Sequence, residues 1–156
     1  MIFHFSIAAD DPARVARVIA QLWAGTARIF PPVGEGSAVA IAGDNSGTTV
    51  EIYARGTELV PGEGDTDAYA AINRQAPRLT ATHAAIATAL SQADVLAIAE
   101  REGWLAKYRN RGGFFGVIEL WLENTTLVEV LTPEMQDEYR ALWVNGGPPW
   151  PAVPAA

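Results

Sequence analysis

The sequence predicts an α+β fold in which two βαβββ modules form a single domain. The main observation is a repeat, because 47 positions separate His4 from Glu51 and 46 separate His83 from Glu129. Each histidine opens a strand-like run that a helix start follows, and each glutamate lies inside a short strand of apolar residues. A repeat of this length indicates a duplicated module whose two copies face each other.

The first module is expected over residues 2–56. Alternation of polar and apolar residues predicts a strand over 2–8, with His4 on the face opposite the phenylalanines. A helix is expected to begin after Asp11, a good N-cap residue, and to end at Gly25. Three more strands are expected at 28–33, where Pro31-Pro32 favours a sheet edge, and at 37–43 and 48–54, which flank a turn.

Residues 57–80 are expected to link the two modules. They are rich in Gly, Pro, Glu and Asp, with one helical turn expected at 67–72, and a connection of this length is often a functional loop or lid. The second module is expected over 81–133, with a helix that Ser91 caps, and residues 133–156 are expected to form a short helix and a Pro-rich tail. The strands expected in the second module are 82–89, 105–111, 114–123 and 127–131.

Composition excludes several classes of function. A chain of 156 residues with 49% hydrophobic and 19% charged residues is typical of one soluble globular domain, and no apolar run is long enough to span a membrane. The net charge of −7 and the lack of a basic stripe argue against nucleic-acid binding. No signal-peptide pattern is present at the N-terminus, so a cytoplasmic location is expected. The expected partner is a small molecule, with no nucleic acid and no membrane.

The four repeated residues are candidate metal ligands. A carboxylate inside an aliphatic strand is costly to bury unless it is paired or binds a metal. Without cysteine, imidazole and carboxylate are the strong ligands that the chain has, and strand parity lets His4, Glu51, His83 and Glu129 point into one cavity. They suit one divalent ion: nickel, zinc, cobalt, manganese or iron(II). Two alternatives stay open, namely ordinary packing or surface residues, and an old site that no longer does chemistry.

Strand parity with the ligands also gives candidate substrate-binding residues in the cavity: Tyr53, Tyr108, Glu119 and Trp121. Packing or surface exposure is the alternative explanation for each of them. Three basic residues, Lys107, Arg109 and Arg111, alternate along one strand and could meet an anionic substrate, although a solvated strand face also explains them.

The paired modules, with His4 and His83 on the first strand of each and Glu51 and Glu129 on the last, resemble the vicinal oxygen chelate superfamily, which includes glyoxalases, bleomycin-resistance proteins and dioxygenases. The resemblance covers most of the chain, from about residue 2 to residue 133. It implies that the two modules form a half-open, curved-sheet barrel around a metal site and that the four residues are its ligands.

The His/Glu/His/Glu pattern is similar to that of glyoxalase I, which implies isomerase or lyase chemistry on a small oxygen-rich metabolite. The metal would chelate adjacent oxygens, and Glu51 or Glu129 would remove a proton next to a carbonyl. The sequence has no recognisable glutathione-binding motif. Alternatives within the superfamily are a ring-cleaving extradiol dioxygenase with iron(II) and a non-catalytic protein that binds a drug-like molecule. The resemblance also allows a homodimer.

Overall fold

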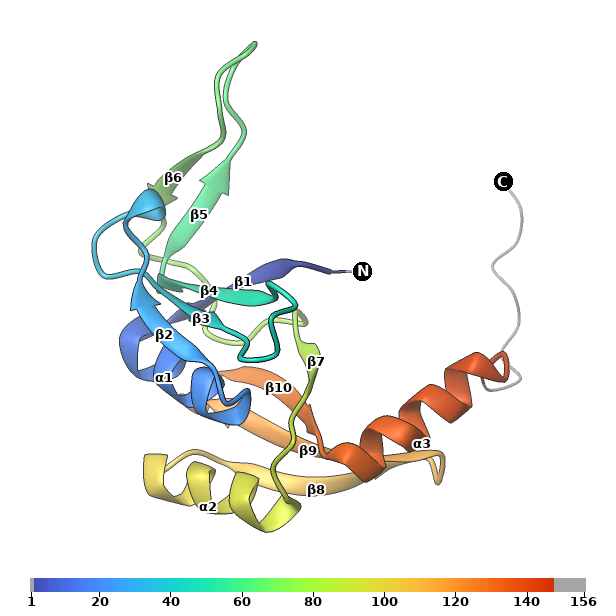
Figure 1. Ribbon diagram of the computed structural model, residues 1–156. Helices are drawn as coiled ribbons and strands as arrows, with labels where there is room; N and C mark the ends of the chain where they lie inside the picture. Colours follow the sequence, from blue (N-terminus) through green and yellow to red (C-terminus); the bar gives the residue numbers. More distant parts are fainter. Residues whose placement is uncertain (1, 148–156) are drawn as a thin grey trace.

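The computed structural model describes residues 2–147 and has two four-stranded sheets, one two-stranded hairpin and three α-helices (Figure 1). The elements of the first half are β1 (His4–Ala9), α1 (Pro12–Leu22), β2 (Thr26–Ile29), a 3-10 turn η1 (Pro31–Val33), β3 (Ala38–Ile41), β4 (Thr49–Ala54), β5 (Thr57–Val60) and β6 (Tyr69–Ile72). Those of the second half are β7 (Ala84–Ala87), α2 (Gln92–Glu102), β8 (Ala106–Arg111), β9 (Phe115–Leu122), β10 (Thr126–Leu131) and α3 (Pro133–Val144).

The two modules have the same topology. The strand order is β1-β4-β3-β2 in the first sheet and β7-β10-β9-β8 in the second. In each sheet the first strand of the module pairs in parallel with the last, and the other neighbours are antiparallel. The prediction of an α+β protein made of two βαβββ modules is therefore confirmed.

Both module helices begin and end where local chemistry favours it. The Asp11 side chain accepts a hydrogen bond from the Arg14 backbone N–H at 2.9 Å, which caps the start of α1. Ser91 and Asp94 form a reciprocal capping box at the start of α2. Gly103 ends α2 with a φ of 70°, a left-handed conformation that glycine adopts without strain.

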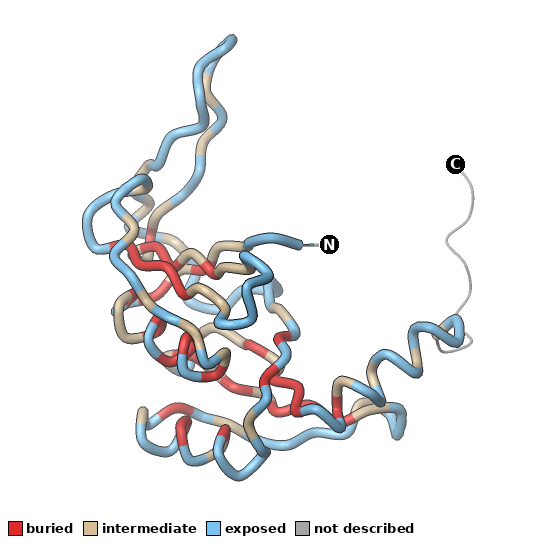
Figure 2. The backbone as a smooth tube through the Cα atoms, in the orientation of Figure 1, coloured by how far each residue is buried: buried red, intermediate tan, exposed pale blue. Residues whose placement is uncertain are grey.

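The core lies between each helix and its sheet, where Figure 2 shows most of the buried residues. Val15, Ile19 and Leu22 of α1 are almost fully buried, and the sheet face that they cover includes the equally buried Val50 and Ile52. In β1 the side chains alternate, so Ile7 belongs to this core face and His4 to the opposite face, as predicted. The helix-covered face holds the fold together and leaves the other face available for polar chemistry.

Polar contacts join the two modules. The Arg14 guanidinium of α1 donates to the Glu102 carboxylate of α2 at 2.8 Å and lies 5.1 Å from the ring of Trp104. Glu123, in the turn after β9, accepts the backbone N–H groups of Asp10 and Asp11, each at 2.6 Å. These contacts connect segments that are about a hundred residues apart in sequence, so they fix the modules relative to each other.

The repeat extends to the turns. Asn45 and Asn124, which are 79 positions apart, as the two histidines are, both have positive φ values, 60° and 57°. Asparagine tolerates this left-handed conformation better than most residues, which suits both tight turns.

Two local predictions need correction, and a third is untested. The strand expected at 28–33 stops at Ile29 and gives way to η1, because Pro31 and Pro32 have no backbone N–H to donate to a sheet. The helical turn expected at 67–72 is wrong, because β5 and β6 form a hairpin that projects from the body (Figure 1). The predicted Pro-rich tail lies outside the described residues from 148 onwards.

Within residues 2–147, no helix combines the length and the apolar character that crossing a membrane requires.

Candidate functional site

The first module brings His4 and Glu51 together. The parallel pairing of β1 with β4 sets Ser6 opposite Glu51, and His4 is two positions before Ser6 on the same face. The His4 Nε2 atom is 4.0 Å from Glu51 Oε1. The sequence prediction that these two residues share a site is consistent with this placement.

Hydroxyl groups surround the Glu51 carboxylate. The Tyr53 hydroxyl donates to Glu51 Oε2, and the Ser6 hydroxyl lies 3.4 Å from the same oxygen and 3.1 Å from the Tyr53 hydroxyl. The Glu51 side chain is only 14% exposed, whereas that of His4 is 58% exposed. Burial, followed by the hydrogen bond to Glu51, raises the pKa of Tyr53 above its ordinary value of 10.0. The phenol therefore keeps its proton near neutral pH and serves as a donor to the carboxylate.

The second module repeats the offset between histidine and glutamate, although His83 lies just before β7 rather than within it. Ala85 lies opposite Glu129 in the β7–β10 register, and His83 is two positions before Ala85, the same offset as between His4 and Ser6. The His83 Nδ1 atom is 3.0 Å from the backbone oxygen of Ala81. This contact leaves Nε2 for another partner, and metal-binding histidines are typically oriented by such a contact.

Glu129 already has a cationic partner. Arg111 of β8 donates from both Nη2 and Nε to Glu129 Oε1, with the Nε contact at 3.0 Å. The same guanidinium is 2.9 Å from Glu119 Oε1. Hydrogen bonding to Glu129, with a smaller contribution from Glu119, raises the pKa of Arg111 above its ordinary value. An ion-pair network therefore holds this carboxylate.

The four predicted ligands are divided between the two modules, His4 and Glu51 in the first and His83 and Glu129 in the second. No group of three or more His, Cys, Asp or Glu side chains within residues 2–147 is arranged to bind a metal ion. The reason is topological, because each histidine and glutamate pair belongs to a different sheet. Imidazole and carboxylate donors suit a divalent ion, but a single chain does not bring these residues into one group, and Glu129 is already paired with Arg111.

The predicted substrate-binding residues have different surroundings. Tyr53 contacts Glu51, and Glu119 lies directly opposite Glu129 on the neighbouring strand. Trp121 is two residues after Glu119, so it lies on the same face of β9. Tyr108, however, pairs with Ile118 and therefore lies on the other face of the sheet. Parity within one strand could not reveal this, because the register between strands was unknown.

Sequence reasoning missed two residues of these networks as site residues, Ser6 and Arg111. Ser6 lies between His4 and the core residues of β1, and its place opposite Glu51 follows only from the strand register. Arg111 had a signal, the alternation of basic residues along 107–111. The explanation of that alternation as a solvated strand face is wrong for Arg111, which pairs with two carboxylates.

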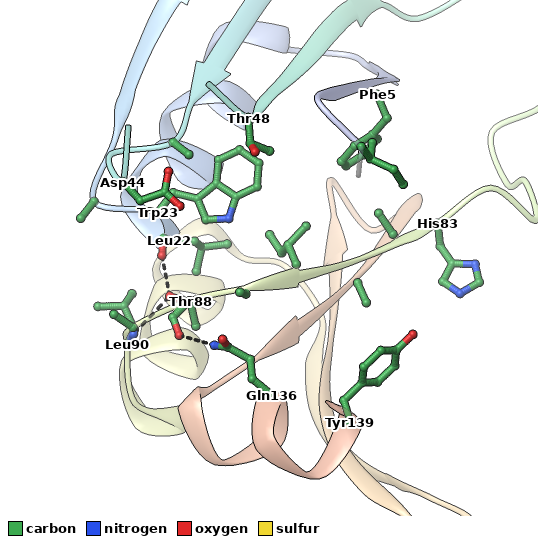
Figure 3. Close-up of a pocket in the computed structure, with 18 of the residues that line it drawn as sticks. Phe5, Leu22, Trp23, Asp44, Thr48, His83, Thr88, Leu90, Gln136 and Tyr139 are labelled. Atoms are coloured by element: carbon green, nitrogen blue, oxygen red, sulfur yellow. Dashed lines mark hydrogen bonds between the residues drawn. The ribbon is translucent and has the colours of Figure 1, made fainter. Parts of the chain in front are cut away.

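A cavity of about 920 Å³ lies beside β7, between β1, the end of α1 and the start of α3 (Figure 3). Alanines of β7 supply much of its wall, and their short side chains leave this space open. Figure 3 shows Phe5 and His83 toward one end, Trp23 and Asp44 toward the other, and Tyr139 reaching in from α3. Its size and mostly apolar lining suit a small organic molecule.

No family model and no curated protein matches the sequence. Solved structures of fosfomycin resistance proteins have a similar fold. FosX from Listeria monocytogenes has a TM-score of 0.57 and 12% sequence identity, and the match covers 90% of the present chain and 97% of the FosX chain. FosX from Mesorhizobium loti has a TM-score of 0.51 and 13% identity, covering 89% and 97%. The Listeria protein complexed with Mn(II) and a sulfate ion has a TM-score of 0.56 and 12% identity, covering 90% and 96%.

The topology of the two modules agrees with these similarities in fold. The chain has the fold of the vicinal oxygen chelate superfamily, as the sequence resemblance implied. At identities of 12–13% the similarity concerns the fold alone.

Proposed function

We propose that the protein is a divalent-metal-dependent enzyme that moves a proton on a small oxygen-rich molecule, as an isomerase or lyase of glyoxalase type does. The main supporting observation is the polar cluster at Glu51, whose half-buried carboxylate has two hydroxyls and one imidazole around it. Strand β4 is otherwise largely buried and apolar at its centre, so a carboxylate here is costly unless hydrogen bonds satisfy it, as those from Tyr53 and Ser6 do.

In this proposal Glu51 takes the proton. The carboxylate faces the same side as His4, where a substrate would meet it, and Tyr53 and Ser6 hold it in a fixed orientation. A positioned carboxylate of this kind removes a proton next to a carbonyl when the carbon approaches within hydrogen-bonding range. Glu129 is the second candidate for this role, but its pairing with Arg111 leaves it less available.

His4, Glu51 and His83 would hold the metal, with Glu129 joining them after release from Arg111. When bound, a divalent ion chelates adjacent substrate oxygens and stabilises the negative charge that develops on them. The Mn(II)-bound FosX structure, which has a similar fold, supports a divalent ion, and nickel, zinc, cobalt and iron(II) are the other candidates.

We further propose that two chains associate to complete the site. The two histidine and glutamate pairs lie on separate sheets of one chain, so a second chain is the simplest way to unite them without refolding a sheet. Large apolar side chains are exposed at the N-terminus and at the end of α3, including Phe3 at 62% and Val144 at 84%. A second chain that packs against the first would cover such side chains. Sedimentation velocity should then report a homodimer.

The cavity beside β7 favours a second candidate function, a protein that binds an apolar or aromatic compound without converting it. In that case a ligand would raise the melting temperature while no product formed. The superfamily resemblance also leaves open the extradiol dioxygenase, which would consume oxygen when given a catechol and iron(II).

The test is a substrate screen on metal-loaded protein. Candidates are α-oxoaldehydes with and without glutathione, catechols with oxygen monitoring, and fosfomycin, because of the structures of similar fold. For any substrate that is turned over, Glu51→Gln should lower kcat at least about 100-fold while the circular dichroism spectrum stays unchanged. Glu58→Gln, which changes an exposed carboxylate on β5, is the matched control. Full turnover by both Glu51→Gln and Glu129→Gln would rule out proton transfer by either glutamate.

A further inference from the structure

A smaller cavity of about 190 Å³ lies where the two modules meet. Its walls come from β1, from residues 77–82, which lead to β7, and from the start of β10. Two arginines line it, and none of the described residues in its lining is acidic. At this volume the cavity suits one small group rather than a whole drug-sized ligand.

One carboxylate holds the two arginines of this cavity side by side. Asp10 accepts a hydrogen bond from Arg55 Nε at Oδ1 and another from Arg78 Nη2 at Oδ2, each at 2.6 Å. Arg55 also donates through Nη2 to Glu123 and to Thr125 of the second module. The Arg55 side chain is only 14% exposed, so these contacts fix the position of its guanidinium.

Both guanidinium groups keep donors beyond these contacts. Each has five N–H groups on three nitrogen atoms. Among the contacts within residues 2–147, Arg55 donates from Nε and Nη2, and Arg78 donates from Nη2 alone. Asp10 and Glu123 balance the charge of the two arginines, but neither carboxylate lines the cavity. The cavity therefore borders the arginine side of this ion-pair network.

Strand β1 adds backbone donors, because it is the edge strand of the first sheet. The Ala9 backbone oxygen accepts the N–H of Arg55, just after β4, at 2.8 Å. Hydrogen bonds to a parallel neighbour recur at every second residue, so the N–H groups of Ser6 and Ala8 face the free edge. Both residues line the cavity. Their carbonyl oxygens face the same edge, so the guanidinium groups would supply the attraction for a negative charge.

We propose that this cavity binds a small oxyanion of the size and charge of phosphate or sulfate. Arg55 and Arg78 form charge-assisted hydrogen bonds to it, and the hydroxyls of Thr80, Thr82 and Thr126, which also line the cavity, are further donors. Because the lining belongs to both modules and to the segment between them, the bound anion stabilises their contact. This inference does not depend on the proposed metal-dependent function.

The experiment is an amide-detected NMR titration with sodium phosphate, at fixed pH and at an ionic strength held constant with NaCl. In the wild type, the signals of Ser6, Ala8 and Thr80 should shift and reach saturation. Arg78→Gln should weaken phosphate binding at least about tenfold, because it removes a charged donor. Arg74→Gln makes the same change in charge at an exposed position of the same segment outside the cavity, so its affinity should stay within about twofold.

Two further measurements separate binding in the cavity from general attraction to positive charge. Sulfate should compete with phosphate for the same signals. Phosphate should raise the melting temperature of the wild type and of Arg74→Gln more than that of Arg78→Gln. Arg78→Lys keeps a charge that can contact phosphate, so it should retain more binding than Arg78→Gln.

Three results would overturn the proposal: shifts that do not saturate, shifts that spare Ser6 and Ala8, or equal affinities of the wild type and Arg78→Gln. An equal loss in Arg74→Gln would also overturn it, since net charge alone would then explain the binding. If Arg78→Gln does not fold, as judged by circular dichroism, Thr82→Val replaces it. That variant removes one hydroxyl donor and should weaken phosphate binding about threefold or more.

Discussion

Tyr53 donates its hydroxyl to Glu51, two residues earlier on the same strand and face of the first sheet. The tyrosine is 7% exposed, and its pKa lies above 10.0 because of burial and then the bond to Glu51. The pair links the stability of the first module to the orientation of the proposed proton acceptor.

Alkaline pH should remove the stability that the hydrogen bond from Tyr53 to Glu51 contributes. The folded protein holds the Tyr53 proton more tightly than the unfolded chain does, so the resulting stability is complete below about pH 10 and is lost as the pH rises through the folded-state pKa. The difference in unfolding free energy between wild type and Tyr53→Phe should therefore shrink between about pH 8 and about pH 11. Urea unfolding at both pH values measures this difference in unfolding free energy. A difference that is the same at both pH values would contradict the assignment.

Arg14 should be a stabilising contact between the modules. Its guanidinium bonds both the carboxylate and the backbone oxygen of Glu102, at 2.8 and 2.6 Å. Arg14→Ala should lower the unfolding free energy by about 1–2 kcal/mol, a value reduced for the partial exposure of the arginine. Arg17→Ala, at an exposed position of the same helix, should cost less than about 0.5 kcal/mol. If chemical denaturation gives the same loss of unfolding free energy for Arg14→Ala and Arg17→Ala, the contact with Glu102 contributes nothing specific.

Acid should remove the stability that the contact between Arg14 and Glu102 contributes. The hydrogen bond from Arg14 is the largest influence on the pKa of Glu102, which lies below the ordinary value of 4.5. Stability from a lowered carboxyl pKa is present above the unfolded value and is lost as the pH falls through the folded one. The difference between wild type and Arg14→Ala should thus diminish below about pH 4.5 and be unchanged between about pH 6 and about pH 8. A difference that persists in full at about pH 2 would contradict this.

Glu123 should stabilise the start of α1. Its two oxygens accept the backbone N–H groups of Asp10 and Asp11, and its side chain is 10% exposed. Glu123→Gln removes the charge and leaves one acceptor oxygen, so the unfolding free energy should fall by about 1–3 kcal/mol. Glu100→Gln, at an exposed position of α2, should change it by less than about 0.5 kcal/mol. An unfolding free energy that Glu123→Gln leaves unchanged would show that water replaces the lost contacts.

The repeat made the fold predictable from sequence. His4 and His83, with the glutamates that follow them, mark equivalent places in two modules, and the hydrophobic periodicity between them defines the same order of strands and helix. The region 57–80 was harder, because the apolar residues of β5 and β6 lie among glycines and acids, which weaken the strand pattern.

The site was predictable only within each module. Register places His4 near Glu51 in the first module, and it sets His83 two positions before the residue opposite Glu129 in the second. The position of one sheet relative to the other depends on side-chain contacts such as Arg14 with Glu102, which periodicity does not encode. The partner of Glu129 was missed for the same reason, because Arg111 reaches it from two strands away.

The most direct test of the proposed centre is Mn²⁺ titration of the wild-type protein, His4→Ala and His83→Ala, each also in an Arg111→Gln background. If both modules supply ligands to one ion, each histidine replacement should weaken Mn²⁺ binding at least about tenfold while the fold is retained. An Mn²⁺ affinity that stays unchanged in either histidine variant, or no binding by both the wild type and Arg111→Gln, would contradict a single metal centre built from the two modules.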